Sequence, residues 1–107
     1  MALAEDCYRM TSKFPREEMF GLTSQIRRAG ASIAANIAEG HGRESTGSFI
    51  QSLRVAQGST KELETHLLLA QRVGIAPAAE VDPILTRCTE VGKMLRSLIR
   101  SLQDKTD

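Results

Sequence analysis

A carboxylate and an imidazole stand four residues apart in the middle of the chain, a spacing that brings two metal ligands to one face of a helix. Glu62 and His66 have this spacing, and Glu64 lies between them. A carboxylate-bridged metal bundle would need a Glu-x-x-His pair on each of two helices. The other histidine, His41, instead lies between two glycines. The ligand set is incomplete, and we expect no metal or other cofactor.

Nucleophilic catalysis would require a side chain activated by a neighbouring base. The serines Ser24, Ser32, Ser48 and Ser59 lie in no motif that supplies one. The stretch 40–43 lacks the Gly-Lys-Ser/Thr ending of a phosphate-binding loop, and no strand pattern precedes it. We therefore expect a protein that is not an enzyme.

Basic side chains form the candidate site for nucleic acid. The set is Arg27, Arg28, Arg43, Lys93, Arg96 and Arg100. Such groups contact phosphates without reading sequence, so binding would have weak sequence preference and strong salt dependence. The alternative is a solvated face on which glutamates such as Glu17, Glu39 and Glu62 neutralise these cations within one chain. A ring of several copies would favour phosphate binding, because it repeats each modest basic patch.

Polar and small residues interrupt the apolar pattern between residues 25 and 40. Those expected to determine packing or assembly are Gln25, Ser32, Asn36, Glu39 and Gly40. Asn36 falls on the apolar seam, and a buried amide costs free energy unless partners satisfy it. Such a residue usually specifies register or pairing, so we expect Asn36 to be structural rather than catalytic.

Apolar residues at three- and four-residue steps predict four helices, at about 2–13, 15–40, 47–73 and from 82 onward. Phe14-Pro15 and Asp82-Pro83 should mark the starts of the second and fourth helices. Gly40-His41-Gly42 should end the second helix in a left-handed cap, and Ser45 or Thr46 should cap the third. Gly58-Ser59 predicts a close helix crossing.

The expected core positions form one stripe per helix. They are Leu3, Cys7 and Met10, then Met19, Leu22, Ile26, Ala29, Ile33 and Asn36, then Phe49, Leu53, Ala56, Thr60, Leu63, Leu67 and Ala70, and finally Ile84, Cys88, Val91, Leu95, Leu98, Ile99 and Leu102. The three basic residues of the last helix fall opposite its stripe. Cys7 and Cys88 should be free thiols, with Cys88 in the core. No period-two pattern indicates a strand.

The fold expected for residues 1–107 is a single all-α domain, an antiparallel up-and-down four-helix bundle. A chain of 107 residues has a thin core, which favours a homo-oligomer. Aromatic residues make up 4% of the chain, which disfavours reading single-stranded RNA by stacking. The net charge of +1 argues against a protein that coats nucleic acid. No long apolar run or signal peptide is present, so we expect a cytoplasmic protein without membrane contact.

One set of short motifs extends over nearly the whole length of the chain: Phe14-Pro15, Glu18, Gly21-Leu22-Thr23, Gln25, Arg27-Arg28-Ala29, Ser32-Ile33, Asn36-Ile37-Ala38-Glu39-Gly40, Gly42-Arg43, Phe49-Ile50, Leu53, Ala56, Gly58-Ser59, Glu62-Leu63-Glu64-Thr65, Leu67 and Gly92-Lys93-Met94-Leu95. These residues resemble the signature of the 23S rRNA intervening-sequence proteins. Members usually have a longer first helix, with aromatic residues before the position of Tyr8.

The resemblance implies a bundle that forms a five-fold ring, so a homopentamer is expected. Some members are encoded within insertions in large-subunit rRNA genes. The related accessory proteins of diversity-generating retroelements bind nucleic acid and a reverse transcriptase through a basic surface. RNA or DNA is accordingly the expected partner, with a reverse transcriptase or another protein as a further one. The alternative function is a protein-interaction scaffold that binds no nucleic acid.

Overall fold

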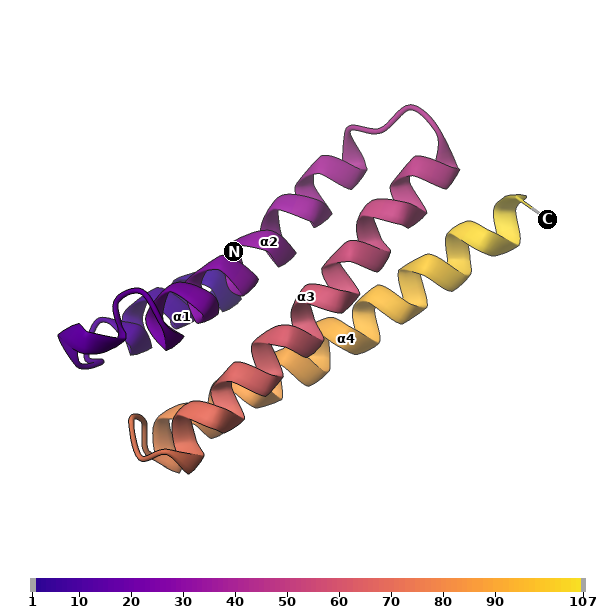
Figure 1. The fold of residues 1–107 in the computed structure, drawn as a ribbon. Helices are drawn as coiled ribbons and strands as arrows, with labels where there is room; N and C mark the ends of the chain where they lie inside the picture. The colour runs from indigo at the N-terminus through magenta and orange to yellow at the C-terminus, as the bar shows by residue number, and fades with distance from the viewer. Residues whose placement is uncertain (1, 107) are drawn as a thin grey trace.

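Four α-helices make up the described part of the chain, as the spacing of apolar residues predicted. The computed structural model describes residues 2–106, which form α1 (Ala2–Thr11), the 3-10 turn η1 (Arg16–Glu18), α2 (Leu22–His41), α3 (Thr46–Arg72) and α4 (Ala78–Thr106). No strand occurs among these residues. The chain reverses after α2 and again after α3, and α3 packs against both α2 and α4 (Figure 1). The predicted all-α class is confirmed.

The core has two parts along the long axis of the bundle. The first lies where α1 packs against α2 and α4, and its fully buried side chains include Cys7, Ile26, Ile33, Leu63, Leu67, Val81 and Cys88. Among the described residues, the second contains four buried ones: Leu53, Ala56, Leu95 and Ile99. The predicted stripes of α1, α3 and α4 are confirmed as buried or half-buried.

The predicted start of α2 at Pro15 is wrong. Arg16–Glu18 form a single 3-10 turn, and α2 begins at Leu22 after Gly21, whose φ of −104° and ψ of −115° are not helical. The break leaves Met19 47% exposed, although it was predicted to be a core residue. An acidic run after a proline therefore marks the turn here, and the helix begins one turn later.

The predicted start of α4 at Asp82-Pro83 is also wrong. The helix begins at Ala78, so Pro83 lies inside it. Proline has no backbone N–H to donate and is tolerated best near a helix start, where few such bonds are lost. Val81 is fully buried, and its packing favours helix on the N-terminal side of Pro83.

The predicted end of α2 and the predicted start of α3 are observed, but the backbone conformation at the end of α2 differs from the prediction. Gly42 ends α2 with a φ of −89°, so this cap is not left-handed; Gly74, after α3, has the positive φ, at 81°. Ser45 caps α3 as predicted, because its side chain accepts a hydrogen bond from the backbone N–H of Ser48. At the predicted Gly58-Ser59 crossing, α2 approaches α3 at Ser59, whose Oγ lies 2.8 Å from Ser32 Oγ. Gly58 does not take part in this contact, since a Cβ there would meet nothing within 4 Å.

Candidate nucleic-acid interface

Three predicted cations of α4 lie together on its solvent-facing side. Lys93, Arg96 and Arg100 follow one another at three- and four-residue steps, which places them on one helix face, and all three are exposed. Among residues 2–106, none of them has a carboxylate within ion-pair distance. Within the described part of the chain, their charges are therefore not neutralised.

A groove of about 570 Å³ runs between α3 and α4, with Arg96 on its lining. Its α3 side consists of Arg54, Gln57, Gly58, Thr60, Lys61 and Glu64, and its α4 side of Cys88, Thr89, Gly92 and Arg96. One glycine on each helix contributes to the hollow, because a glycine has no side chain to fill the space. Each such glycine costs a helix interior about 1 kcal/mol relative to alanine.

Arg54 and Lys61 are the cations that sequence reasoning missed. They stand seven residues apart on α3, close to two helical turns, and both line the groove opposite Arg96. The signal was present in the sequence, since Arg54, Gly58 and Lys61 recur at four- and three-residue steps. It could be interpreted only after α3 and α4 were known to be neighbours.

The electrostatic balance of the groove is positive. Three cations line it against one carboxylate, Glu64, whose Oε2 lies 3.9 Å from Lys61 Nζ. Arg54 has no ion pair within the part of the chain that the structure describes. None of the described residues that line the groove is aromatic, so they offer charge for phosphate oxygens and no ring for base stacking.

The predicted cations of α2 lie elsewhere. Arg27 is half-buried, its Nε donates to Thr11 Oγ1 at 2.8 Å, and its guanidinium carbon lies 4.6 Å from the centre of the Tyr8 ring. Arg28 is exposed and lines a hollow beside Phe20. The six predicted residues therefore do not form a single surface.

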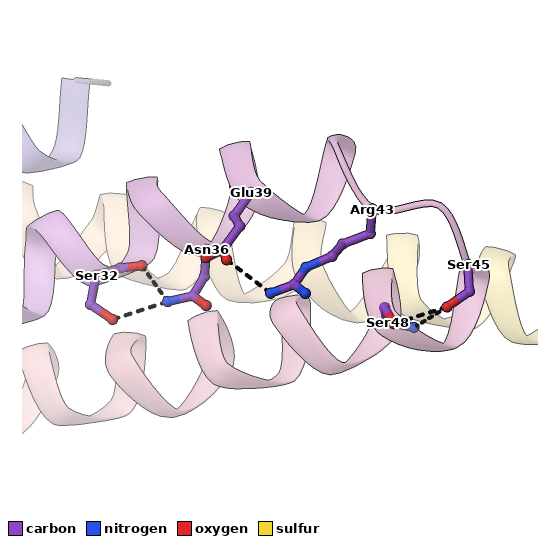
Figure 2. Close-up of polar contacts among 6 residues, drawn as sticks. All are labelled: Ser32, Asn36, Glu39, Arg43, Ser45 and Ser48. Carbon is purple, nitrogen blue, oxygen red and sulfur yellow. Dashed lines mark hydrogen bonds and ion pairs between the residues drawn. The ribbon is translucent and has the colours of Figure 1, made fainter.

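Arg43 is the predicted cation that has a carboxylate partner. Its Nη2 donates to Glu39 Oε1 at 2.8 Å, one turn away, as Figure 2 shows. Both side chains are exposed, and such i, i+4 pairs contribute about 0.3–0.5 kcal/mol to stability. The pair neutralises the charge that a phosphate would otherwise meet at Arg43.

The residues predicted to determine packing make contacts within one copy of the chain. Ser32 Oγ lies 2.8 Å from Ser59 Oγ on α3. Asn36 Nδ2 donates to Ser32 O at 2.9 Å and to Ser32 Oγ at 3.2 Å (Figure 2). A Cβ on Gly40 would lie only 2.8 Å from Phe49 Cδ1. These positions hold α2 close to α3, while Gln25 is half-buried on α2.

The Glu62 and His66 pair is present without further ligands. Glu62 Oε1 lies 3.5 Å from His66 Nε2, and the structure brings no group of three or more His, Cys, Asp or Glu side chains together within residues 2–106. Within the same range, no helix has the length and apolar content that crossing a membrane requires.

Both cysteines are free and buried in the first part of the core. Burial raises the thiol pKa of each to about 12. Electrostatic repulsion adds to the pKa shift: the Asp6 carboxylate disfavours the Cys7 thiolate, and a Cys7 thiolate and the Glu64 carboxylate both disfavour the Cys88 thiolate. The thiolate is the nucleophilic form, so neither side chain is a reactive nucleophile at neutral pH.

Comparison with known proteins agrees with this architecture. The model of the 23S rRNA-intervening sequence protein family matches residues 1–97. A crystal structure of a protein of unknown function from the S23 ribosomal protein family, from Bacteroides thetaiotaomicron, is similar with a TM-score of 0.77 and 27% sequence identity, over 91% of this chain and 97% of that one. No curated protein matches the chain. Since the family match covers nearly the whole length, the chain belongs to the 23S rRNA-intervening sequence protein family.

Proposed function

We propose that this chain is a non-catalytic protein that binds the phosphate backbone of RNA or DNA along the groove between α3 and α4. The observation that carries the proposal is a set of four cations that have no carboxylate partner among residues 2–106. Arg54 and Arg96 line the groove, and Lys93 and Arg100 are exposed on the same face of α4 as Arg96. Lys61, only loosely paired, adds a fifth. Clustered basic residues on one face are the electrostatic footprint of phosphate recognition.

The proposal includes assembly into a homopentameric ring of antiparallel up-and-down bundles in the cytoplasm. Exposed apolar side chains support self-association, above all Phe20, which is 94% exposed. A ring would repeat the groove in every copy, so weak phosphate contacts would act together on one long ligand. A reverse transcriptase or another protein is the proposed further partner.

Salt dependence tests the phosphate mechanism. We expect binding to a duplex DNA or a structured RNA hairpin to weaken steeply with salt, because each phosphate contact releases a condensed counterion. Four contacts to duplex DNA would lower the affinity about 50-fold between roughly 50 and 150 mM salt. Fluorescence anisotropy at the two salt concentrations measures this change, and equal affinity at both would exclude the mechanism.

Charge reversal locates the site. The variant K93E/R96E/R100E should lose RNA binding at 150 mM salt, to a signal indistinguishable from that of free RNA. A matched variant, R16E/R72E/K105E, changes the net charge by the same amount at exposed positions away from the groove and should bind as the wild type does. Equal loss in both variants would mean that total charge, rather than this surface, controls binding.

The second candidate function is a scaffold that recruits a protein and binds no nucleic acid. The exposed Phe20, Met19 and Tyr8 favour it, because aromatic residues, Met and Arg are enriched at protein interfaces. Under this alternative, K93E/R96E/R100E would retain the native protein partners in a pull-down, and the wild-type protein would give no anisotropy change with either nucleic acid.

A further inference from the structure

One end of the bundle exposes a concentrated apolar and basic surface, which we call surface A: Tyr8, Met19, Phe20, Arg27 and Arg28. These residues surround a hollow of about 330 Å³. Phe20 is 94% exposed, Tyr8 52% and Met19 47%. Burying an aromatic side chain as large as Phe20 would contribute a few kcal/mol of stabilising free energy. A single copy of the chain does not gain this free energy, because it leaves the side chain in solvent.

The outer face of α2 continues surface A with unusually little charge. Ala31, Ala35 and Ala38 are all exposed and follow one another at three- and four-residue steps. A helix face in contact with water usually carries charged residues, because these are solvated favourably. A face of alanines lets another helix approach closely, which extends surface A along the bundle.

A second apolar surface lies on the other flank of the η1 turn, and we call it surface B: Glu17, Glu18, Leu69, Val73 and Ile75. These residues line a hollow of about 640 Å³. Leu69 is 46% exposed and Val73 57%. Surface B therefore combines exposed aliphatic side chains with carboxylates, whereas surface A combines exposed aromatic side chains with guanidinium groups.

We infer that surface A of one copy docks onto surface B of a second copy of this chain, with Phe20 as the anchor. The charges decide the pairing: contact between A and B brings Arg28 toward Glu17 and Glu18, whereas A against A or B against B would place like charges together. The inference rests on the self-association proposed above and identifies the surfaces that meet. Because the two surfaces differ, the contact is head-to-tail, the kind that repeats from copy to copy and can close into a ring.

Single substitutions on each surface provide the first test. We expect F20E and L69E each to reduce the mass in sedimentation or multi-angle light scattering to that of one protomer, 11.7 kDa. Both side chains are exposed, so the helical circular dichroism should not change. The matched control is L68E, since Leu68 is 48% exposed and adjacent to Leu69 but does not line surface B; it should retain the wild-type mass.

Mixing the two variants tests the head-to-tail order. F20E retains surface B and L69E retains surface A, so an equimolar mixture should form a heterodimer of twice the protomer mass. A mixture that stays at one protomer mass, or an F20E variant that keeps the wild-type mass, would overturn the inference.

The outcomes also separate this inference from the proposed function. The groove cations are intact in F20E, so this variant should still bind RNA, more weakly than the assembled protein. Wild-type protein that sediments as one protomer would overturn both self-association and the docking of A onto B, and would leave phosphate binding standing. Assembled wild-type protein without RNA binding would contradict only the proposed function.

Discussion

At the scale of single residues, burial determines the chemistry of the two thiols. Cys7 and Cys88 come from helices far apart in sequence and pack in the same part of the core. Their pKa values rise from 9.0 to about 12, chiefly because burial disfavours the thiolate. Packing in this core favours the uncharged, unreactive thiol, because a charged sulfur would have no solvent around it.

These shifts predict a loss of stability at alkaline pH. Below pH 9 the folded and unfolded chains both keep the thiol protons, so this contribution is constant. From pH 9 to about 12 the unfolded chain releases protons that the folded chain retains, and the free energy of unfolding falls. Urea unfolding at pH 8 and pH 10.5 should show a larger fall for the wild type than for C7A/C88A. Equal falls in the two proteins would contradict the assignment.

Prediction of individual residues succeeded where a helix pattern alone decides exposure. Lys93, Arg96 and Arg100 lie opposite the apolar stripe of α4, and the structure exposes all three. Asn36 was expected to need partners, and it has Ser32. Arg54 and Lys61 were missed because their importance depends on which helix lies beside α3, and Phe20 was missed because the start of α2 was misplaced.

At the scale of helices, Gly40 and Gly58 differ in what surrounds them. Gly40 of α2 lies directly against the Phe49 ring of α3. The centroid of this ring lies 5.0 Å from the centroid of the His41 ring. Gly58 of α3 faces open space. Both interrupt helices with a residue of low helix propensity, so only the surroundings distinguish them.

Alanine substitutions should separate the two positions. G58A should raise the free energy of unfolding by about 1 kcal/mol, because the helix gains propensity and nothing obstructs the new methyl group. G40A should lower it by about 1 kcal/mol or more, because a Cβ 2.8 Å from Phe49 Cδ1 forces the ring or α2 to shift. Urea unfolding followed by circular dichroism measures both, and a G40A variant as stable as G58A would refute the close contact.

Helix boundaries were harder to predict than helix existence, for local reasons. Pro15 and Pro83 were both interpreted as helix starts. In the structure a 3-10 turn follows Pro15, and Pro83 lies within α4, whose first residue is Ala78. A proline marks where a backbone donor is missing, and packing at residues such as Val81 decides whether the helix continues past it.

At the scale of the whole molecule, four stripes of apolar residues were enough to predict an all-α bundle. Family membership and the similar crystal structure agree with this class. The arrangement of the core could not be predicted in the same way, because it depends on length: α1 has 10 residues, whereas α3 has 27 and α4 has 29. The bundle measures 48 × 21 × 18 Å, and α1 supports only one part of it.

The shortness of α1 implies an order of opening. Amide hydrogens near Val81 and Leu67, behind the α1 packing, should exchange with deuterium at rates close to those of global unfolding, while amides near Leu98 and Leu102 should exchange faster by local fraying. Mass spectrometry of exchanged peptides measures the gradient, and uniform protection along α4 would contradict it. The last turns of α4 should therefore open repeatedly while the rest of the protein stays folded. The end of the bundle that α1 covers should open only when the whole bundle unfolds.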